Sequence, residues 1–104
     1  MEKVRWVEKD RYGNEIYLTD ERWEHITNPM NHPEMEECET ALRETIRFGS
    51  RKQEMLDPQK YRYSRAFGDL AASNTHIVAV VIFRFSKELM PNNFIVTAYQ
   101  KKIW

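Results

Sequence analysis

Residues 75–85, THIVAVVIFRF, decide the fold, because they are apolar at almost every position. A strand at the centre of a sheet is covered on both faces, so it shows a continuous apolar run instead of an alternating one. The flanking segments, residues 61–67 (YRYSRAF) and residues 93–103 (NFIVTAYQKKI), alternate as strands with two different faces do. Residues 51–56, RKQEML, precede the turn sequence DPQK. The pattern predicts three or four strands joined by short loops.

Two helices are predicted before these strands. Residues 33–48 begin with a proline, which suits the first helical position, and precede Gly49, which suits the end of a helix. The apolar stripe of this helix is Met35, Cys38, Leu42, Thr45 and Ile46. Residues 20–26, DERWEHI, predict a shorter helix with Thr19 or Asp20 as its N-cap.

A turn signal near the N-terminus completes the order of elements. Gly13 and Asn14 lie between two short segments rich in β-branched and aromatic residues, which predicts a hairpin. The order of hairpin, two helices and then strands predicts an α+β fold, with the helices packed on one face of a largely antiparallel sheet of about four strands. A length of 104 residues with 41% of them apolar fits a single domain over residues 1–104.

Composition and charge narrow the function classes. Cys38 is the only cysteine, which excludes an internal disulfide. No run approaches the ~20 apolar residues of a membrane span, and the N-terminus lacks the apolar region of a signal peptide, so we expect a soluble, cytoplasmic protein without a membrane partner. Residues 1–50 hold 7 Lys/Arg against 12 Asp/Glu, and residues 51–104 hold 9 against 4. The second half could present a basic face to a polyanion, although solvated acidic helices would give the same split.

The histidines of the helical segment are the first candidates for chemistry. The rotation of a helix puts His25 on the flank of Arg22 and away from the apolar pair Trp23 and Ile26. We therefore expect an accessible His25, as an ordinary surface histidine would also be. His32 follows a proline-containing turn, and we interpret it as the N-cap of the second helix. Neither histidine has a carboxylate pair at a metal-ligand spacing, so no metal and no cofactor are expected.

Two strands hold the other candidates. Arg62, Tyr63 and Arg65 interleave cations, which can hold a phosphate, with rings that can stack on a base. Thr97 and Tyr99 offer hydroxyls on one face of the last strand. Ile95 and Lys101 share that face, and the opposite face, expected in the core, is Phe94, Val96 and Ala98. Ordinary solvent-exposed strands would show the same patterns.

Taken in order, five segments resemble small bacterial and phage proteins of the barnase–EndoU–colicin–RelE-like superfamily, the BECR fold. The segments are IYLTDERWEHI, HPEMEECETALRETIRFG, YRYSRAF, HIVAVVIF and NFIVTAYQKKI, within residues 16–103. The resemblance implies helices followed by a curved antiparallel sheet of about four strands. It also implies a metal-independent ribonuclease, like RelE- or colicin-type toxins, that cleaves RNA by 2′-OH attack on the phosphodiester. Such proteins usually read Arg-His-Pro-Glu after the first helix, where this chain has Asn31 instead of the arginine.

Carried over by position, the resemblance implies catalytic roles for His25, Arg65 and Thr97. RNA cleavage without a metal needs a base, an acid and cations for the charge that develops on the phosphate. His25 would act as the acid or base, because histidine ordinarily titrates near neutrality. Arg62 or Arg65 would hold the phosphate, and Thr97 would hydrogen-bond it. The substrate-binding candidates are Arg62, Tyr63, Tyr99 and Lys101. We expect the three catalytic candidates to surround one concave surface.

The partners follow from these hypotheses. The ribonuclease hypothesis implies RNA, and the resemblance adds an antitoxin or immunity protein. The alternative is a non-catalytic interaction module, whose acidic helices and basic sheet pair with another protein or with a second copy in a homodimer. The opposite charges of the two halves motivate this alternative. Cleavage of RNA in the presence of EDTA would separate the two hypotheses.

Overall fold

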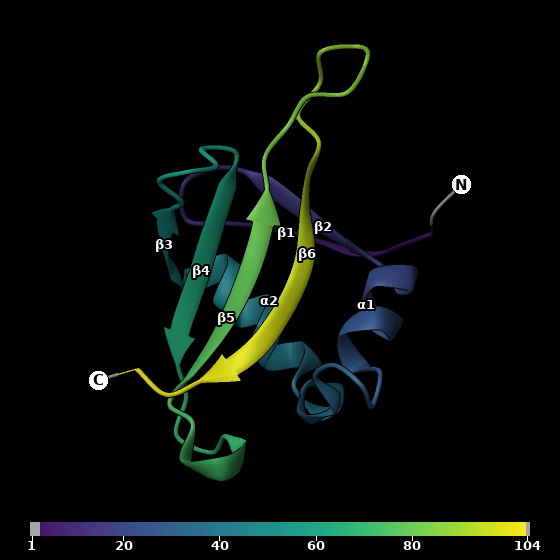
Figure 1. Cartoon of the computed structure of the whole chain (residues 1–104). Helices are drawn as coiled ribbons and strands as arrows, with labels where there is room; N and C mark the ends of the chain where they lie inside the picture. The colour runs from purple at the N-terminus through teal and green to yellow at the C-terminus, as the bar shows by residue number, and fades with distance from the viewer. Residues whose placement is uncertain (1–2, 104) are drawn as a thin grey trace.

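The centre of the molecule is a six-stranded sheet with the order β1-β2-β6-β5-β4-β3. The structure is a computed structural model that describes residues 3–103. Its strands are β1 (Val4–Lys9), β2 (Glu15–Thr19), β3 (Ser50–Gln53), β4 (Lys60–Ala66), β5 (His76–Ile82) and β6 (Asn93–Lys101). Its helices are α1 (Asp20–Thr27), η1 (Pro33–Glu37), α2 (Glu39–Phe48) and η2 (Ala71–Ser73), of which η1 and η2 are 3₁₀ helices. The predicted α+β class is confirmed (Figure 1).

The sheet is wider than the four strands expected. β1 and β2 form the predicted antiparallel hairpin, and β2 then pairs in parallel with β6. The register places Ile16 opposite Asn93 and Tyr17 opposite Phe94. The hairpin therefore extends the sheet instead of packing on it, and the count rises to six. This pairing joins segments from opposite ends of the chain, so no local sequence pattern predicts it.

The two predicted helices are present, but the second is interrupted. The Thr19 side chain caps α1 by accepting a hydrogen bond from the Arg22 backbone N–H at 3.1 Å. The segment expected as one helix from residue 33 is a 3₁₀ turn and an α-helix that meet at Cys38, where φ is −111° and ψ is 19°. The break lets Met35 of η1 and Leu42 of α2 both lie fully buried.

Gly49 ends α2 at a point where two backbones come close. Its N–H donates to the Thr45 carbonyl at 2.9 Å, as predicted for a helix end. A Cβ atom at this position would lie 2.3 Å from the Thr45 oxygen and 2.8 Å from the Ser64 oxygen. No side chain fits there, so glycine lets β3 start directly beside β4.

One face of the sheet is packed against the helices and forms the core. α2 contributes Leu42, Thr45 and Ile46, which are buried. The sheet residues of this core are Trp6, Ile16, Leu18, Tyr63, Ile77, Ala79, Val81, Ile95 and Ala98. We call this side the helix-covered face. In Figure 1 it points away from the viewer, with α2 behind β4 and β5.

A β-bulge in β6 changes which of its side chains reach the core. Val80 pairs with Thr97 and Val81 with Ile95, so Val96 has no partner opposite it. The extra residue interrupts the period of two, and Ile95 and Ala98 both lie fully buried on the helix-covered face. The expectation that Val96 belongs to the core together with Ala98 is therefore wrong. So is the matching expectation for Phe94, and both residues line the opposite side of the sheet.

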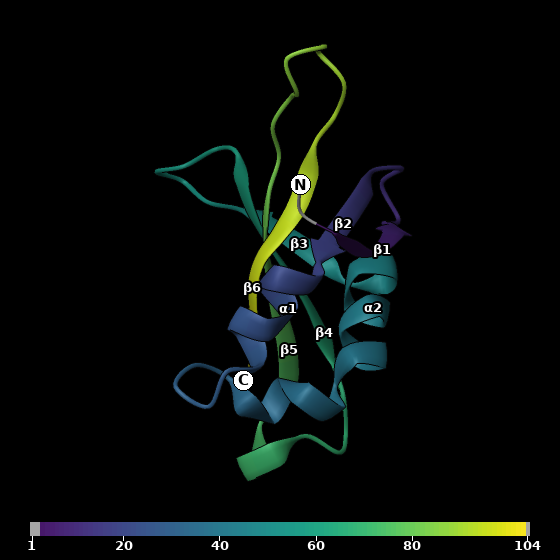
Figure 2. The same cartoon turned by 90° about the vertical axis from the view of Figure 1, so that its right-hand side faces the viewer.

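The near side of the sheet in Figure 1 is the open face, because no helix among the described residues lies over it. Figure 2 shows two loops that project beyond the sheet on this side. One joins β3 to β4, and the other joins α1 to η1. The β3–β4 loop and the segment after α1 therefore flank the open face. Within residues 3–103, no helix has the length and apolar character needed to cross a membrane.

Candidate functional site

The open face contains a groove of about 560 Å³ that runs across β4, β5 and β6. Its apolar floor consists of Val80, Ile82, Phe94 and Val96. Its polar lining is Arg22, Asp57, Lys60, Arg62, Arg84, Thr97 and Tyr99. We call this surface the open-face groove. Four cations against one carboxylate make it suitable for an anionic ligand.

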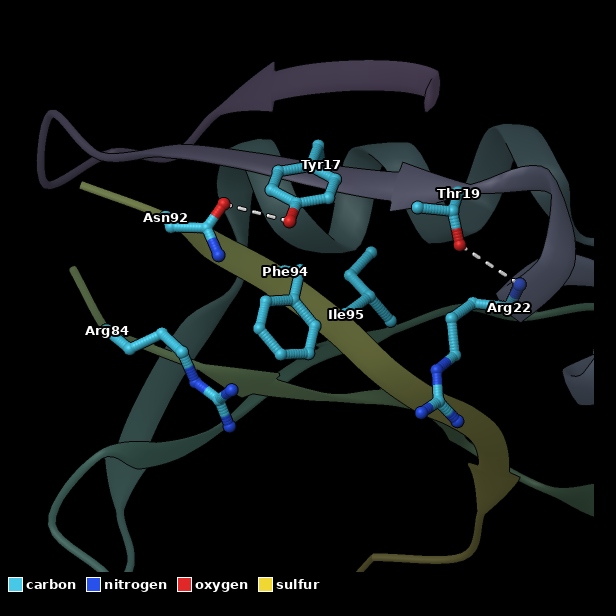
Figure 3. Close-up of a pocket in the computed structure, with 7 residues that line it drawn as sticks. All are labelled: Tyr17, Thr19, Arg22, Arg84, Asn92, Phe94 and Ile95. Atoms are coloured by element: carbon cyan, nitrogen blue, oxygen red, sulfur yellow. Dashed lines mark hydrogen bonds between the residues drawn. The ribbon is translucent and has the colours of Figure 1, made fainter. Parts of the chain in front are cut away.

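Arg22 and Arg84 both line the open-face groove, and both also line an adjoining hollow of about 290 Å³. Figure 3 shows the Phe94 ring between the two guanidinium groups. The Arg84 guanidinium stands 5.1 Å from the centre of that ring. Neither guanidinium forms an ion pair with a carboxylate of residues 3–103. Both are therefore available to an external anion.

Arg62 and Tyr99 are joined by a hydrogen bond farther along the groove. The Arg62 Nη1 donates to the Tyr99 hydroxyl at 3.0 Å, and its Nε donates to the Glu54 carboxylate. Burial alone lowers the pKa of the Arg62 guanidinium, but the bonds to Glu54 and Tyr99 outweigh this and raise it. Arg62 is thus a fixed cation, and Glu54 occupies part of its bonding capacity.

His32 lies beside this pair. Its ring centre is 5.6 Å from that of Tyr99, and the planes are tilted by 35°. It stands at the N-cap position of η1, as expected, but its side chain makes no capping hydrogen bond. Its Nδ1 is 3.6 Å from the Glu34 carboxylate. His32 therefore occupies the predicted N-cap position without a side-chain cap, and its imidazole contacts a residue of the groove.

The loop before His32 explains how it reaches β6. The His32 backbone N–H donates to the Ile26 carbonyl at 2.9 Å, and the Asn31 side chain donates to the His25 carbonyl at 2.8 Å. These bonds fold the chain back over the end of α1. Asn31 thus has a defined structural role: its side chain holds the turn at the end of α1 by donating to the His25 carbonyl, and so positions His32.

His25 is exposed on α1, as predicted, but it does not line the open-face groove. It borders a separate hollow of about 300 Å³ together with Glu21, Arg22 and Glu24. Arg22 lines both hollows and separates His25 from the groove. Two carboxylates beside His25 also make its surroundings unfavourable for a phosphate.

Tyr63 and Arg65 are on the helix-covered face. Tyr63 is fully buried, and Arg65 donates to the Glu44 carboxylate of α2 at 2.9 Å. Thr97 lines the groove on the opposite face. The three residues predicted as catalytic, His25, Arg65 and Thr97, therefore do not surround one surface.

Four of the predicted residues do lie on the open face. Arg62, Thr97 and Tyr99 line the groove. Lys101 lines a neighbouring hollow that shares Arg62 with the groove. The structure adds Arg22, Arg84 and His32, which sequence reasoning missed as ligand-binding residues. For Arg84 a signal existed, because it continues the two-residue period of Val78, Val80 and Ile82 beyond the end of β5.

A second polar cluster, on the helix-covered face, is fully satisfied internally. Asp10 accepts hydrogen bonds from the Tyr63 hydroxyl, the Tyr12 and Asn14 backbone N–H groups and the Asn14 side chain. Burial raises the pKa of the Asp10 carboxyl, but these bonds more than offset it and the net pKa is lowered. Burial and the bond to Asp10 raise the pKa of Tyr63. This cluster ties the hairpin to β4 and leaves no group free for a ligand.

Among residues 3–103, no group of three or more His, Cys, Asp or Glu side chains is arranged to hold a metal ion.

No protein-family model, curated protein or solved structure matches the chain at a significant level.

Proposed function

We propose that this protein binds RNA in the open-face groove and cleaves it as a metal-independent ribonuclease of the BECR type. One observation carries the proposal: the cations Arg22 and Arg84 have no carboxylate partner in the described chain and share one groove with Thr97 and the Arg62–Tyr99 pair. Phosphate contacts from arginine supply most of the affinity of a protein for a nucleic acid. The activity is also the one implied by the resemblance of residues 16–103 to that superfamily.

The side chains of the groove can be assigned complementary roles. Arg22 and Arg84 hold the phosphodiester backbone, and the Thr97 hydroxyl donates a hydrogen bond to a phosphate oxygen. The ring of Phe94 offers an apolar surface for a base beside these cations. Arg62, which lines the same groove, stabilises the negative charge that develops on the phosphate.

Proton transfer falls to His32 and Tyr99 in this proposal. His32 removes the 2′-OH proton, the 2′-oxygen attacks the phosphorus, and the bond to the 5′-oxygen breaks. The Tyr99 hydroxyl protonates the departing 5′-oxygen, and the Arg62 N–H that it accepts at 3.0 Å stabilises the phenolate left behind. The products are a 2′,3′-cyclic phosphate and a 5′-hydroxyl end.

A cleavage assay with two histidine variants tests the proposal. Wild type, His32→Ala and His25→Ala are incubated with labelled single-stranded RNA in EDTA. We expect His32→Ala to lower the cleavage rate by about 10²-fold or more, the usual contribution of a general base, and to leave RNA affinity within about threefold. His25→Ala should cleave at nearly the wild-type rate. The reverse ranking would return the acid–base role to His25, and RNA binding without cleavage by wild type would remove the catalytic part.

The interaction-module alternative has one observation of its own. The loop between β5 and β6 exposes three large apolar side chains: Phe85, Leu89 and Met90. Such a tip suits contact with a protein, either an antitoxin or immunity protein or a second copy. Sedimentation at low and high salt tests the second copy, because a monomer under both conditions contradicts a homodimer. RNA binding by the monomer would favour the ribonuclease.

A further inference from the structure

The hollow that Lys101 lines has a volume of about 670 Å³ and adjoins the β3–β4 loop. We call it the loop pocket. It is lined by Lys52, Gln53, Glu54, Met55, Leu56, Arg62 and Lys101. Arg62 also lines the open-face groove, so the two hollows are continuous at that residue. Figure 2 shows the β3–β4 loop extending away from α2, on the side of the open face.

The loop presents two adjacent apolar side chains to solvent. Met55 is 94% exposed and Leu56 is 99% exposed. Side chains of this size contribute to stability only when they are covered, and here nothing in the described chain covers them. An apolar pair at the mouth of a pocket therefore indicates a surface that another molecule covers.

The loop is held in a defined shape although its tip is exposed. The Glu54 N–H donates to the Lys60 carbonyl at 2.9 Å, and the Lys60 N–H donates to Asp57 at the same distance. The Gln53 side chain closes the base of the loop by donating to the Pro58 carbonyl at 2.7 Å. Met55 and Leu56 are thus presented by an ordered turn, which reduces the entropy cost of binding a ligand.

The charges around the pocket specify the kind of ligand. Lys52 and Lys101 form no ion pair within residues 3–103, and Arg62 pairs with Glu54 alone. Three cations against one carboxylate favour an anion, while the apolar pair favours a flat or apolar surface. A nucleotide has both features, because its base has apolar faces and its phosphate is negative.

From these observations we infer that the loop pocket binds a nucleotide of single-stranded RNA adjacent to the phosphate held in the open-face groove. Met55 and Leu56 pack on the base, and Lys52 and Lys101 contact its phosphate. Continuity at Arg62 lets one strand pass from the groove into the pocket. The inference rests on the proposed RNA binding, and it defines the pocket as the determinant of how many nucleotides the protein contacts.

The test uses a double variant in each of two loops. Met55→Ser/Leu56→Ser removes the apolar surface of the pocket. Leu89→Ser/Met90→Ser is the matched control, because these side chains are 78% and 62% exposed and line neither hollow. The probes are a fluorescent RNA dinucleotide, an RNA octamer and an octamer of the same backbone without bases, with binding measured by anisotropy. Melting temperatures verify that both variants are folded.

We expect wild type to bind the octamer more tightly than the dinucleotide. The Met55→Ser/Leu56→Ser variant should bind the octamer roughly tenfold more weakly, because the apolar surface that packs on the base is lost. The same variant should bind the dinucleotide and the base-free octamer as tightly as wild type does. The Leu89→Ser/Met90→Ser variant should match wild type with all three probes. If the Met55→Ser/Leu56→Ser variant binds the octamer as tightly as wild type and the Leu89→Ser/Met90→Ser variant do, the inference is overturned but the proposed function is kept. If the Met55→Ser/Leu56→Ser substitutions weaken binding of a poly-glutamate peptide but not binding of RNA, the loop pocket binds a protein and the inference is overturned. Failure of wild type to bind any RNA would overturn both proposals.

Discussion

The two faces of the sheet use the same residue type in opposite ways. On the helix-covered face, Arg65 is neutralised by Glu44, and Arg51 lies 3.8 Å from Asp10 with aromatic rings around it. On the open face, Arg22 and Arg84 have no carboxylate partner in residues 3–103. Arg62 on the open face is also paired, with Glu54, so Arg22 and Arg84 are the groove cations that are fully available to a ligand.

This difference has an energetic consequence. A buried carboxylate that accepts several hydrogen bonds leaves unsatisfied donors when it is removed, which costs stability. An exposed arginine without a partner contributes little to the free energy of unfolding, but it contributes to the affinity for a phosphate. Substitutions on the two faces should therefore separate stability from binding.

The largest effect is expected at Asp10. Asp10→Ala leaves the Tyr63 hydroxyl and the N–H donors of Tyr12 and Asn14 without an acceptor inside the protein. We expect a loss of about 3 kcal/mol in the free energy of unfolding, measured by urea denaturation. The exposed Asp69 provides the control, since Asp69→Ala should change stability by less than about 0.5 kcal/mol. Equal stability of the two variants would contradict a structural role for the buried cluster.

The next effect concerns binding instead of stability. Arg22→Ala and Arg84→Ala should each weaken RNA binding by about tenfold, or about 1.4 kcal/mol, and leave the unfolding free energy nearly unchanged. Arg65→Ala should do the reverse, with unchanged RNA affinity and a loss of about 0.5 kcal/mol in stability. Anisotropy titrations and urea denaturation of all three proteins measure both quantities. If Arg65→Ala weakens binding as much as Arg84→Ala does, the distinction between the faces fails.

The sequence was a good guide to elements whose signal is local. The apolar run in residues 75–85 and the helical spacing in residues 39–48 both report on their immediate neighbours, and both elements are present. The bulge at Val96 is different, because it depends on how β6 pairs with β5. Alternation assumes that every residue has a partner, so it assigned Phe94 and Val96 to the core. The parallel pairing of β2 with β6 was missed for a similar reason, since it is a long-range contact.

The kinds of residue in the candidate site could be predicted from the sequence, but their positions on the two faces of the sheet could be predicted only in part. The alternation of β4 already put Arg62 on one face and Tyr63 and Arg65 on the other, and only the packing of α2 shows which face is covered. His32, and not His25, lies beside the groove because hydrogen bonds from the His32 backbone N–H and the Asn31 side chain fold the chain back after α1. Those bonds have no simple sequence signature.

Lowering the pH should reduce the free energy of unfolding through Asp10, but by less than the substitution Asp10→Ala does. The pKa of Asp10 is lowered in the folded protein, so the unfolded chain takes up a proton at this position first as pH falls. Its contribution to stability is therefore complete above the ordinary carboxyl pKa of about 4 and is lost as pH decreases further. Urea denaturation between pH 7 and pH 3 should show a steeper loss for wild type than for Asp10→Asn. Parallel pH profiles would show that Asp10 does not carry this dependence.

The smallest effect compares the two carboxylates that neutralise an arginine on β4. Glu54 binds Arg62 on the open face, and Glu44 binds Arg65 on the helix-covered face. Glu54→Gln should raise RNA affinity about two- to threefold at low salt, because it frees the Arg62 guanidinium that a phosphate must otherwise share.

Glu44→Gln removes the same charge from the protein, so it controls for the change in net charge. Its RNA affinity should stay close to that of wild type, since Arg65 points away from the groove. Titrations at low and high salt measure the difference, which should shrink as salt screens the exposed charges. An equal gain in both variants would mean that net charge, and not the release of Arg62 in the open-face groove, controls the affinity.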